Sequence, residues 1–388
     1  MLRVSTLYAS TASASAGYYT KYLTQADGEI PGVWAGNQAV RFGLSGAVEA
    51  EQLERLLSGC DPNTGATLRQ PLVNRVQADG RVVRAVSGFD ATVSAPKSLS
   101  AWWALTGDQR LLDAHDLAVK AVIETLQRYG ATTRIRSNDG RLHPDTQGLT
   151  IAAFRQSTSR LDDPQIHTHV VISAKVQDAD GRWFALDARM LKKHQRTLGG
   201  VYQSVLRAEL AERFGVRFGE IVNGQAEIDG VPQQLLDVFS KRAVQVDQAL
   251  LVKEAEFRRR EQREPTRFEH AAMQREAAAD TRRNKTGHTV PDLRTRWMST
   301  ACSSTGLSLA GWVRRASPLA RDARAGSRPA TRCWWYRHVR VAIPNAAQAS
   351  SIPTLGVQWV TSSIKSSGSS RWRRCVLRRA APSIFPGR

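Results

Sequence analysis

The sequence has little cysteine and no long apolar segment. Its 388 residues contain four cysteines, too few for the disulfide framework that stabilises many secreted proteins. No run reaches the length of about 18 apolar residues that a membrane-spanning helix needs. The N-terminal stretch MLRVSTLYASTASASAGYY also lacks the apolar centre of a signal peptide. These absences predict a cytoplasmic protein that does not insert into membranes.

The sequence also lacks a nucleotide-binding P-loop. The pattern G-x-x-x-x-G-K-[ST] occurs nowhere in it, so the loop and lysine that hold ATP phosphates in many motor proteins are missing. We therefore expect no helicase activity from this chain. With 41% hydrophobic residues the chain can bury a large core, and its length allows two or three domains.

Acidic residues are almost absent from the end of the chain. The formal net charge of +20 points to a polyanionic partner such as nucleic acid. Residues 299–388 hold 15 of the 55 basic residues and one of the 35 acidic residues, Asp322, so this tail carries +14 and residues 1–298 carry +6. The body is thus mildly basic, as expected of a nucleic-acid enzyme with a local binding groove.

The tail differs from the body in composition as well. It has 14 arginines but one lysine, holds three of the four cysteines and keeps no helical or strand period. This composition is typical of GC-rich DNA translated out of frame, so we hypothesise a frameshift near Ser299 that truncates the protein. The alternative is a genuine disordered basic tail that binds DNA nonspecifically. The chain then divides into a core (residues 1–230), a helical extension (231–298) and a basic, low-order tail (299–388).

Two histidines separated by one residue are the sharpest chemical signal. His167 and His169 flank Thr168 within the stretch FRQSTSRLDDPQIHTHVVISAKV, and the β-branched residues that follow favour a strand. Side chains alternate faces along a strand, so both imidazoles lie on one face, close enough to share a cation. The spacing alone fits a metal site, a solvated pair or a buried hydrogen-bonded pair.

Three tyrosines in five residues form a second cluster near the N-terminus. Tyr18, Tyr19 and Tyr22 fit one face of a helix that packs on the core. The functional alternative is that one phenol is a nucleophile. With a pKa of about 10 it would need a metal, a base or a neighbouring cation.

The stretch GFDATVSAPKSLSAWW predicts a strand through Asp90 and a helix that begins near Lys97. On a strand facing the histidines, Asp90 could act as a base or orient a ligating histidine. A turn aspartate that caps local amides is the alternative. Lys97 and Ser98, at the start of a helix, are placed to contact phosphate through side chains and free amides.

Further candidates for DNA contact are cationic or aromatic. Arg160 lies in a loop between predicted strands, and Arg155 lies in the same stretch. Single-stranded DNA would also stack its bases on aromatic rings, for which Trp34, Trp102 and Trp183 are candidates.

Helical periodicity predicts helices at residues 108–129, 198–214, 233–264 and 266–285, with a hairpin turn at 178–182. His115 lies inside the first helix and is expected to be a packed or solvated residue rather than a ligand. Strands interspersed with helices, followed by a helical C-terminal part, predict an α+β fold in which helices pack on an antiparallel sheet.

Residues 1–298 resemble the N-terminal relaxase domain of the MobF-type conjugative relaxases, the relaxase-helicases, which belong to the HUH endonucleases. Four blocks match in order and spacing: GYYTKY, GLSG, FDATVSAPKSLS, and FRQSTSRLDDPQIHTHVVISAKV followed by DARMLKKHQRTLGGVYQSVLRAEL. The resemblance implies a palm-like antiparallel sheet that holds a divalent metal over a single-stranded DNA cleft.

The resemblance also implies a reaction and roles for particular residues. A tyrosine attacks the phosphodiester at an origin of transfer, which yields a 5′-phosphotyrosyl protein and a free 3′-hydroxyl that can later be rejoined. By position, Tyr18 is the leading nucleophile with Tyr19 adjacent, Asp90 is the base or a ligand-orienting carboxylate, and His167 and His169 are metal ligands. The implied partners are single-stranded and hairpin DNA at the origin, a coupling protein and a type IV secretion system.

The chain departs from the family pattern at two points. The family commonly has a third histidine, but the residue eleven positions before His167 is Gln156. An amide oxygen suits a hard cation better than a soft one, so we expect Gln156 to be the third ligand of Mg²⁺ or Mn²⁺. The alternative is that Gln156 does not bind the metal and water takes its place. Many members also carry two tyrosine pairs, whereas here Tyr22 is followed by Leu23.

Other functions remain open on the sequence alone. A truncated, non-catalytic protein could bind hairpin DNA at the origin without cutting it. A metal-bound hydrolase that activates water is a third reading, and a rolling-circle replication initiator or transposase is the nearest variant of the same tyrosine chemistry.

Overall fold

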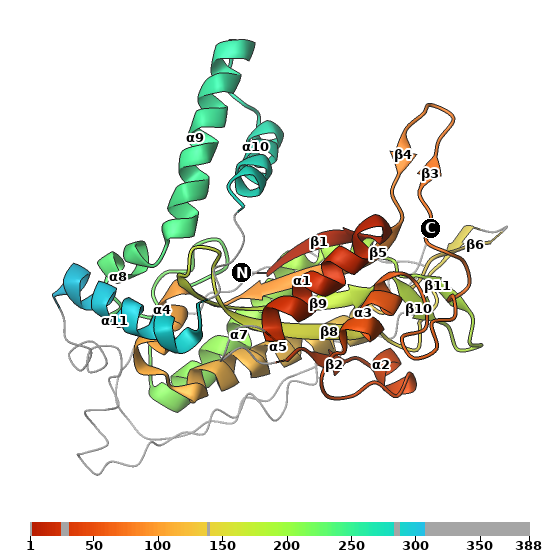
Figure 1. Cartoon of the computed structure of the whole chain (residues 1–388), viewed down its shortest axis with the longest axis horizontal. Coiled ribbons are helices and arrows are strands. Elements are labelled where there is room, and N and C mark those ends of the chain that lie inside the picture. The colour runs from red at the N-terminus through yellow and green to blue at the C-terminus, as the bar shows by residue number, and fades with distance from the viewer. Residues whose placement is uncertain (1, 25–30, 138–139, 283–287, 307–388) are drawn as a thin grey trace, which may run out of the picture. The chain divides into compact units, whose positions relative to one another are not determined.

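The computed structural model describes residues 2–24, 31–137, 140–282 and 288–306, with the backbone alone for residues 20–24 and 137 (Figure 1). Structural statements below concern these residues. The predicted tail from Ser299 lies mostly outside them, and the hypotheses about its origin stay predictions.

A five-stranded sheet lies at the centre of the fold, with strand order β1-β5-β9-β8-β2. Every neighbouring pair in it is antiparallel. The strands are β1 (Leu2–Tyr8), β2 (Val33–Ala35), β5 (Val86–Ser94), β8 (Ile151–Thr158) and β9 (Pro164–Ser173). The predicted antiparallel palm is confirmed. The histidine strand, β9, is its middle strand, where neighbours on both sides hold it.

Helices cover both faces of this sheet (Figure 1). On the face that carries the two histidines lie α1 (Ala12–Thr24) and α3 (Ala50–Leu57), which pack on Phe154 and Val171. On the opposite face lie α4 (Lys97–Thr106), α5 (Gln109–Tyr129) and α7 (Gln195–Phe214), in the larger core. Both faces of the central strands are therefore buried.

The sequence explains why the longest of these helices forms. The apolar residues of α5 recur at helical spacing and face the sheet. Its N-cap, Asp108, accepts a hydrogen bond from the amide of Arg110, and Gly130 follows its last residue. The prediction for residues 108–129 is thus confirmed to within a residue.

The remaining elements of the core are short. They comprise a 3₁₀ turn (Ala9–Thr11), α2 (Asn37–Arg41), α6 (Arg189–Lys193) and the hairpins β3 (Arg75–Val76) with β4 (Val82–Val83), β6 (Ile135–Ser137) with β7 (Gly140–Leu142) and β10 (Lys175–Gln177) with β11 (Trp183–Ala185). The last hairpin confirms the predicted turn at 178–182. None of the helices in the described part of the chain has both the length and the apolar character needed to cross a bilayer.

The C-terminal part is helical, as predicted, but its first helix is divided. The prediction of one helix over residues 233–264 is wrong: α8 (Gln233–Val238) ends before α9 (Lys241–Glu261). Phe239 turns into the main core between them, and the hydroxyl of Ser240 donates to the carbonyl of Leu236. Burial of an aromatic ring thus outweighs continuous helical hydrogen bonding.

Two further helices complete the fold. The first, α10 (Arg267–Asp280), begins with a capping box between Thr266 and Glu269 and packs on α9 through a small separate core. The second, α11 (Val290–Thr305), buries Trp297 and Ala301 in the main core. It continues past the boundary that the composition places at residue 299.

Candidate functional site

The two histidines meet on the α1 face of the sheet, with ring centroids 5.1 Å apart. Nδ1 of His167 lies 2.8 Å from the carbonyl oxygen of Gln165, and Nδ1 of His169 lies 2.8 Å from Oδ2 of Asp90. Because each Nδ1 faces an acceptor, it carries the ring proton and the lone pair is on Nε2. This is the tautomer in which an imidazole ligates a metal.

Gln156 lies opposite His167 in the β8–β9 register and is fully buried. Side chains of directly paired residues point to the same face of a sheet, so its amide belongs to the histidine face. Within the described residues, no three His, Cys, Asp or Glu side chains are grouped to hold a metal ion. A three-ligand set here therefore needs a donor of another kind, and an amide oxygen beside two imidazoles fits a divalent cation.

Asp90 lies in the middle of β5, so the alternative that it caps a turn is wrong. Its Oδ2 accepts the hydroxyl proton of Tyr19 at 2.9 Å as well as the Nδ1 proton of His169. The hydroxyl of Thr92 lies 3.3 Å from Oδ1. The buried carboxylate thus orients a histidine through its second nitrogen, which is one of the two roles that the sequence left open.

The two adjacent tyrosines have different environments. Tyr19 is 4% exposed and stacks on Phe154 at 5.3 Å between centroids. Burial, and secondarily the carboxylate of Asp90, raise the pKa of the Tyr19 hydroxyl far above its usual value. Tyr19 therefore stays protonated and is closed off from solvent.

Tyr18 is only half-buried and lies among cations. Its hydroxyl accepts a hydrogen bond from Nη2 of Arg160 at 3.2 Å. The guanidinium carbons of Arg160 and Arg282 lie 5.5 Å and 5.7 Å from its ring centroid, and the ring of His169 lies 6.2 Å away. The Tyr18 phenol is thus placed between the histidine pair and two positive charges. The side chain of Tyr22 lies outside the described residues.

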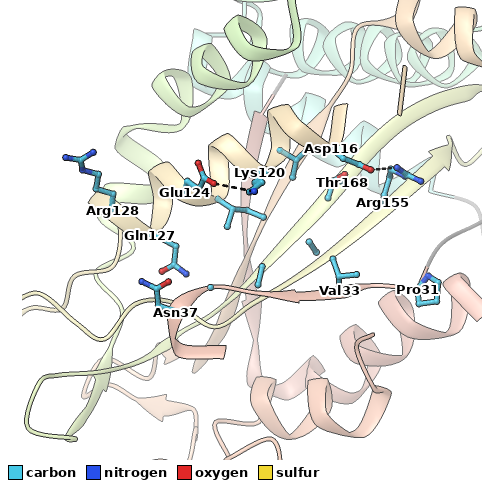
Figure 2. A pocket seen from close by; sticks show the side chains of 15 residues that line it. Pro31, Val33, Asn37, Asp116, Lys120, Glu124, Gln127, Arg128, Arg155 and Thr168 are labelled. Atoms are coloured by element: carbon cyan, nitrogen blue, oxygen red, sulfur yellow. Dashed lines mark hydrogen bonds and ion pairs between the residues drawn. The ribbon is translucent and has the colours of Figure 1, made fainter. Parts of the chain in front are cut away.

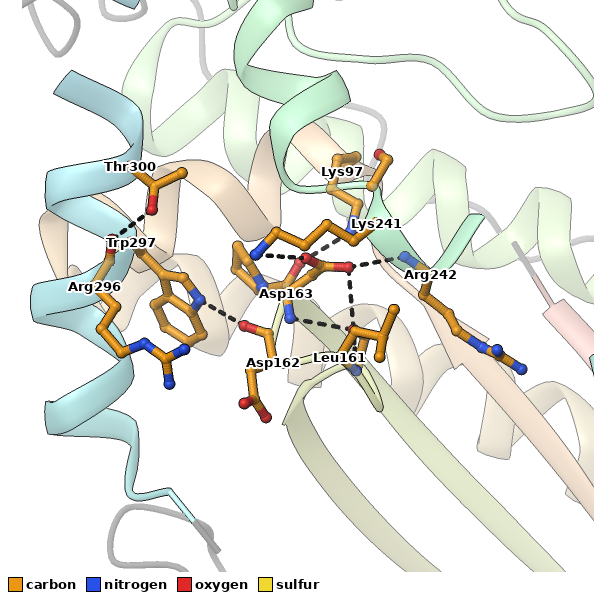
Figure 3. A network of polar contacts seen from close by, with 12 residues as sticks. Lys97, Leu161, Asp162, Asp163, Lys241, Arg242, Arg296, Trp297 and Thr300 are labelled. Carbon is orange, nitrogen blue, oxygen red and sulfur yellow. Dashed lines mark hydrogen bonds and ion pairs between the residues drawn. The ribbon is translucent and has the colours of Figure 1, made fainter. Parts of the chain in front are cut away.

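The loop that carries Arg160 is anchored to the C-terminal helices (Figure 3). Asp163 is 1% exposed and accepts hydrogen bonds from the backbone N of Arg242 at 3.1 Å and from Oγ of Ser159 at 3.3 Å. The indole Nε1 of Trp297 in α11 donates to the carbonyl oxygen of Asp162 at 2.6 Å. Burial raises the pKa of Asp163, although these contacts and nearby lysines oppose the shift.

The same helices hold the second cation. The guanidinium of Arg242 donates to the carbonyl oxygens of Ala278 and Thr281 at the end of α10, both at 2.8 Å. This contact holds in place the turn from which Arg282 reaches Tyr18. The sequence predicted helices of mixed charge here and offered residues 239–246 as a possible lining of a DNA groove. It did not predict that Arg242 and Trp297 anchor this region or that Arg282 reaches Tyr18, because no local motif identifies these contacts.

At the start of α4, the prediction that the backbone amides of Lys97 and Ser98 are free to bind phosphate is wrong. The backbone N–H groups of Lys97 and Ser98 donate to the carboxylate of Glu227, at 3.3 Å and 2.7 Å. Ser98 is buried, and Nζ of Lys97 donates to the carbonyl oxygen of Pro164 at 3.0 Å. Burial lowers the pKa of Lys97 to about 8. A carboxylate of the chain itself thus occupies the positive end of this helix.

Three other predicted contact residues do not join the histidines. Arg155 lies one residue from Gln156 on β8, so its side chain points to the opposite face of the sheet. There it forms an ion pair with Asp116 of α5. Trp102 is 3% exposed and packs on Phe214, and Trp34 is also buried. The prediction that these two indoles stack on bases is therefore wrong.

Trp183 stacks on Phe42 at 5.5 Å and is half-buried, so it remains a candidate for base stacking. It comes from β11, at the side of the sheet where the short hairpins lie (Figure 1).

A basic cavity of about 840 Å³ lies beside these hairpins. One acidic residue, Asp187, and seven basic residues line it: Arg69, Arg75, Arg84, Arg134, Lys175, Arg189 and Lys192. The guanidinium of Arg69 also covers the ring of Phe184 at 4.7 Å. Such a concentration of one charge sign around aromatic surface suits a polyanion.

An antiparallel sheet with two histidines on its middle strand and a tyrosine pair against them is the arrangement that the resemblance to the MobF-type relaxases implied. The sequence profile of the TrwC relaxase family matches residues 3–303. The chain therefore belongs to the TrwC relaxase family.

Relatives of known function agree with this membership. The multifunctional conjugation protein TraI of Escherichia coli is 34% identical over 328 residues, which cover 80% of this chain and 17% of TraI. TraI of E. coli strain K12 is 32% identical over 334 residues, which cover 82% of this chain and again 17% of TraI. The chain thus spans about a sixth of the length of these relatives.

Solved structures of the conjugative relaxase TrwC share the fold. Metal-free TrwC in complex with oriT DNA has a TM-score of 0.63 and 29% identity, over 80% of this chain and all of the other. A copper-bound complex gives a TM-score of 0.64 at 29% identity with the same coverage. TrwC with a 27-mer that comprises the recognition hairpin and the cleavage site gives 0.63 and 28%, again with the same coverage.

Proposed function

We propose that this chain nicks one DNA strand at an origin of transfer, with Tyr18 as the nucleophile, and can rejoin that strand. The observation that carries the proposal is the position of the Tyr18 hydroxyl, hydrogen-bonded to Arg160 and next to the ring of His169. Tyr19 cannot take this role because its hydroxyl is buried and donates to Asp90.

The reaction is a transesterification. The Tyr18 oxygen forms a bond to phosphorus, the bond from phosphorus to the 3′ oxygen breaks, and that oxygen takes up a proton from solvent and leaves as a hydroxyl. Arg160 and Arg282 stabilise negative charge on the phenolic oxygen and on the phosphate. The phenol proton leaves to solvent on the exposed side of the ring, because Asp90 already accepts two protons from other groups.

His167, His169 and Gln156 would hold a divalent cation. When bound, such an ion polarises the scissile phosphate and offsets the charge that develops on it. The hard amide oxygen of Gln156 favours Mg²⁺ or Mn²⁺. Asp90 keeps the His169 ring in the ligating tautomer. Metal-bound, copper-bound and metal-free forms of TrwC have all been solved.

DNA at an origin of transfer is the proposed substrate. TrwC has been solved with oriT DNA and with its recognition hairpin. On this chain the basic cavity with its seven cations offers a surface for duplex phosphates. The single strand would pass Tyr18 between Arg160 and Arg282. A coupling protein and a secretion system stay predictions.

The experiment incubates the full chain with a labelled origin oligonucleotide and Mg²⁺ or Mn²⁺, followed by denaturing electrophoresis. We expect a covalent protein–DNA adduct that is lost in Tyr18→Phe and kept in the matched variant Tyr19→Phe. Binding without an adduct in the wild type would favour an origin-binding protein that does not cut. Cleavage that persists in both variants would favour a hydrolase that activates water.

A further inference from the structure

Thr168, the residue between the two histidines, points away from them. Side chains alternate along β9, so Thr168 faces α5 on the opposite side of the sheet. Its neighbours on that face, Ile166 and Val170, are apolar and fully buried. Valine has the shape of threonine and would fill the same space, so the hydroxyl at position 168 needs a reason other than packing.

The hydroxyl belongs to a chain of buried hydrogen bonds. Oγ1 of Thr168 lies 2.8 Å from Nε2 of His115, in the middle of α5. Nδ1 of His115 lies 2.7 Å from the hydroxyl oxygen of Tyr202, in α7. All three side chains are buried, with exposed fractions of 3% for Thr168 and 0% for His115 and Tyr202. The chain links two helices to the strand that carries both candidate ligands.

The charge state of this chain is fixed at physiological pH. Burial, followed by the nearby Arg155, lowers the pKa of His115 to about 3, and burial raises the pKa of Tyr202 well above its usual value. The imidazole is therefore neutral, with one donor and one acceptor nitrogen, and the phenol keeps its proton. In either tautomer both contacts can form.

Packing alone does not hold β9 at this point. Thr168 borders a cavity of about 700 Å³ between β2, β8 and α5 (Figure 2). Where side chains do not fill the space, close packing cannot define how far a strand stands from the helix behind it. The ladder hydrogen bonds set the register of β9, and the hydrogen bond between Thr168 and His115 connects it to α5.

We propose that Thr168, His115 and Tyr202 are positioning residues. Through them, α5 and α7 hold β9 so that the two histidines on its other face converge on one cation. A buried polar network that is fully paired defines one geometry more sharply than an apolar core does. The inference rests on the proposed metal site, because it explains how the two histidines are held in the positions that binding of a cation requires.

The test is a Mn²⁺ titration of the full chain, with free Mn²⁺ followed by electron paramagnetic resonance and stability followed by thermal unfolding. Thr168→Val removes the hydroxyl and keeps the shape, whereas Thr168→Ser keeps the hydroxyl and loses the methyl group. We expect the dissociation constant to rise about tenfold in Thr168→Val, as for other residues that orient ligands. In Thr168→Ser it should change less than about twofold.

A second variant of the network and one control variant separate an effect on positioning from an effect on stability. Tyr202→Phe removes only the outer hydrogen bond and should raise the dissociation constant about threefold, since one contact of a coupled pair is lost. Val122→Ala creates a cavity in α5 away from the network. It should lower the unfolding temperature without changing Mn²⁺ affinity.

Two results would overturn the inference. Equal affinity of Thr168→Val and Thr168→Ser, or a loss in Val122→Ala as large as in Thr168→Val, would leave the network a stabilising core contact only. His169→Ala tests the metal site itself. If the wild type fails to bind Mn²⁺, or if His169→Ala still binds it, the proposed metal site fails and this inference with it.

Discussion

Replacement of Asp90 by asparagine should weaken the metal site without unfolding the protein. One carboxylate oxygen accepts the protons of both Tyr19 and His169, at 2.9 Å and 2.8 Å. An asparagine carbonyl can take both bonds, but without the charge. A charge-assisted hydrogen bond is about twice as strong as a neutral one, so His169 loses about 1 kcal/mol of orientation energy. We therefore expect Mn²⁺ affinity to fall about fivefold, since about 1.4 kcal/mol corresponds to a factor of ten.

Asp90→Ala provides the contrast. It removes the shared acceptor of two buried donors, the Tyr19 hydroxyl and His169 Nδ1, for which the Thr92 hydroxyl at 3.3 Å from Nδ1 is a poor replacement. Each unsatisfied donor costs about 1–3 kcal/mol. The free energy of unfolding should therefore fall by about 2–6 kcal/mol in Asp90→Ala, and by less than about 1 kcal/mol in Asp90→Asn. Calorimetric titration with Mn²⁺ and urea denaturation measure the two quantities. Unchanged metal affinity in Asp90→Asn would refute the orienting role.

Four further outcomes follow from the structure. Tyr19→Phe should lower the free energy of unfolding by about 1.5–3 kcal/mol, the worth of a hydrogen bond to a charged group such as the Asp90 carboxylate, and a larger loss in urea denaturation would mean that the hydroxyl has other partners. Glu227→Gln should cost about 1 kcal/mol, since a single amide oxygen cannot accept both amides at the start of α4; unchanged stability would show that the carboxylate is not a cap. Lys97 has a pKa of about 8 in the folded protein, against 10.5 for the free side chain. Between pH 8 and pH 10.5 the unfolded chain therefore binds more protons at Lys97 than the folded chain does. The free energy of unfolding should rise with pH in this range, by at most about 1.4 kcal/mol per pH unit. Lys97→Met should flatten that slope when unfolding is measured from pH 7 to 10. Resequencing of the gene should reveal a neighbouring frame after Ser299 that encodes a P-loop motor, and its absence would remove the frameshift hypothesis.

Local patterns predicted the elements that carry the chemistry. The β-branched run after the histidines identified β9, and helical periodicity with a following glycine identified α5. Alternation along β9 was sufficient to place His167 and His169 on one face. These inferences succeed because a strand and a helix impose their periods of two and 3.6 residues over neighbouring positions, whatever the rest of the chain does.

Local sequence patterns could not predict contacts between segments that are distant in the chain. Glu227 lies about 130 residues from the helix that it caps. Arg282 reaches Tyr18 only because α9 and α10 return it there. The long helix predicted over residues 233–264 is divided because burial of Phe239 depends on core residues from other elements.

The sequence by itself determined the strand of the two histidines, their common face and the adjacency of the two tyrosines. Only the tertiary structure decided which tyrosine is partly accessible to solvent, since Tyr18 and Tyr19 are adjacent and chemically identical. Tyr19 is buried against Phe154 and its hydroxyl donates to Asp90, whereas the hydroxyl of Tyr18 accepts a hydrogen bond from Arg160. The physical reason is that burial and electrostatic environment come from neighbours in space, which the local sequence does not specify.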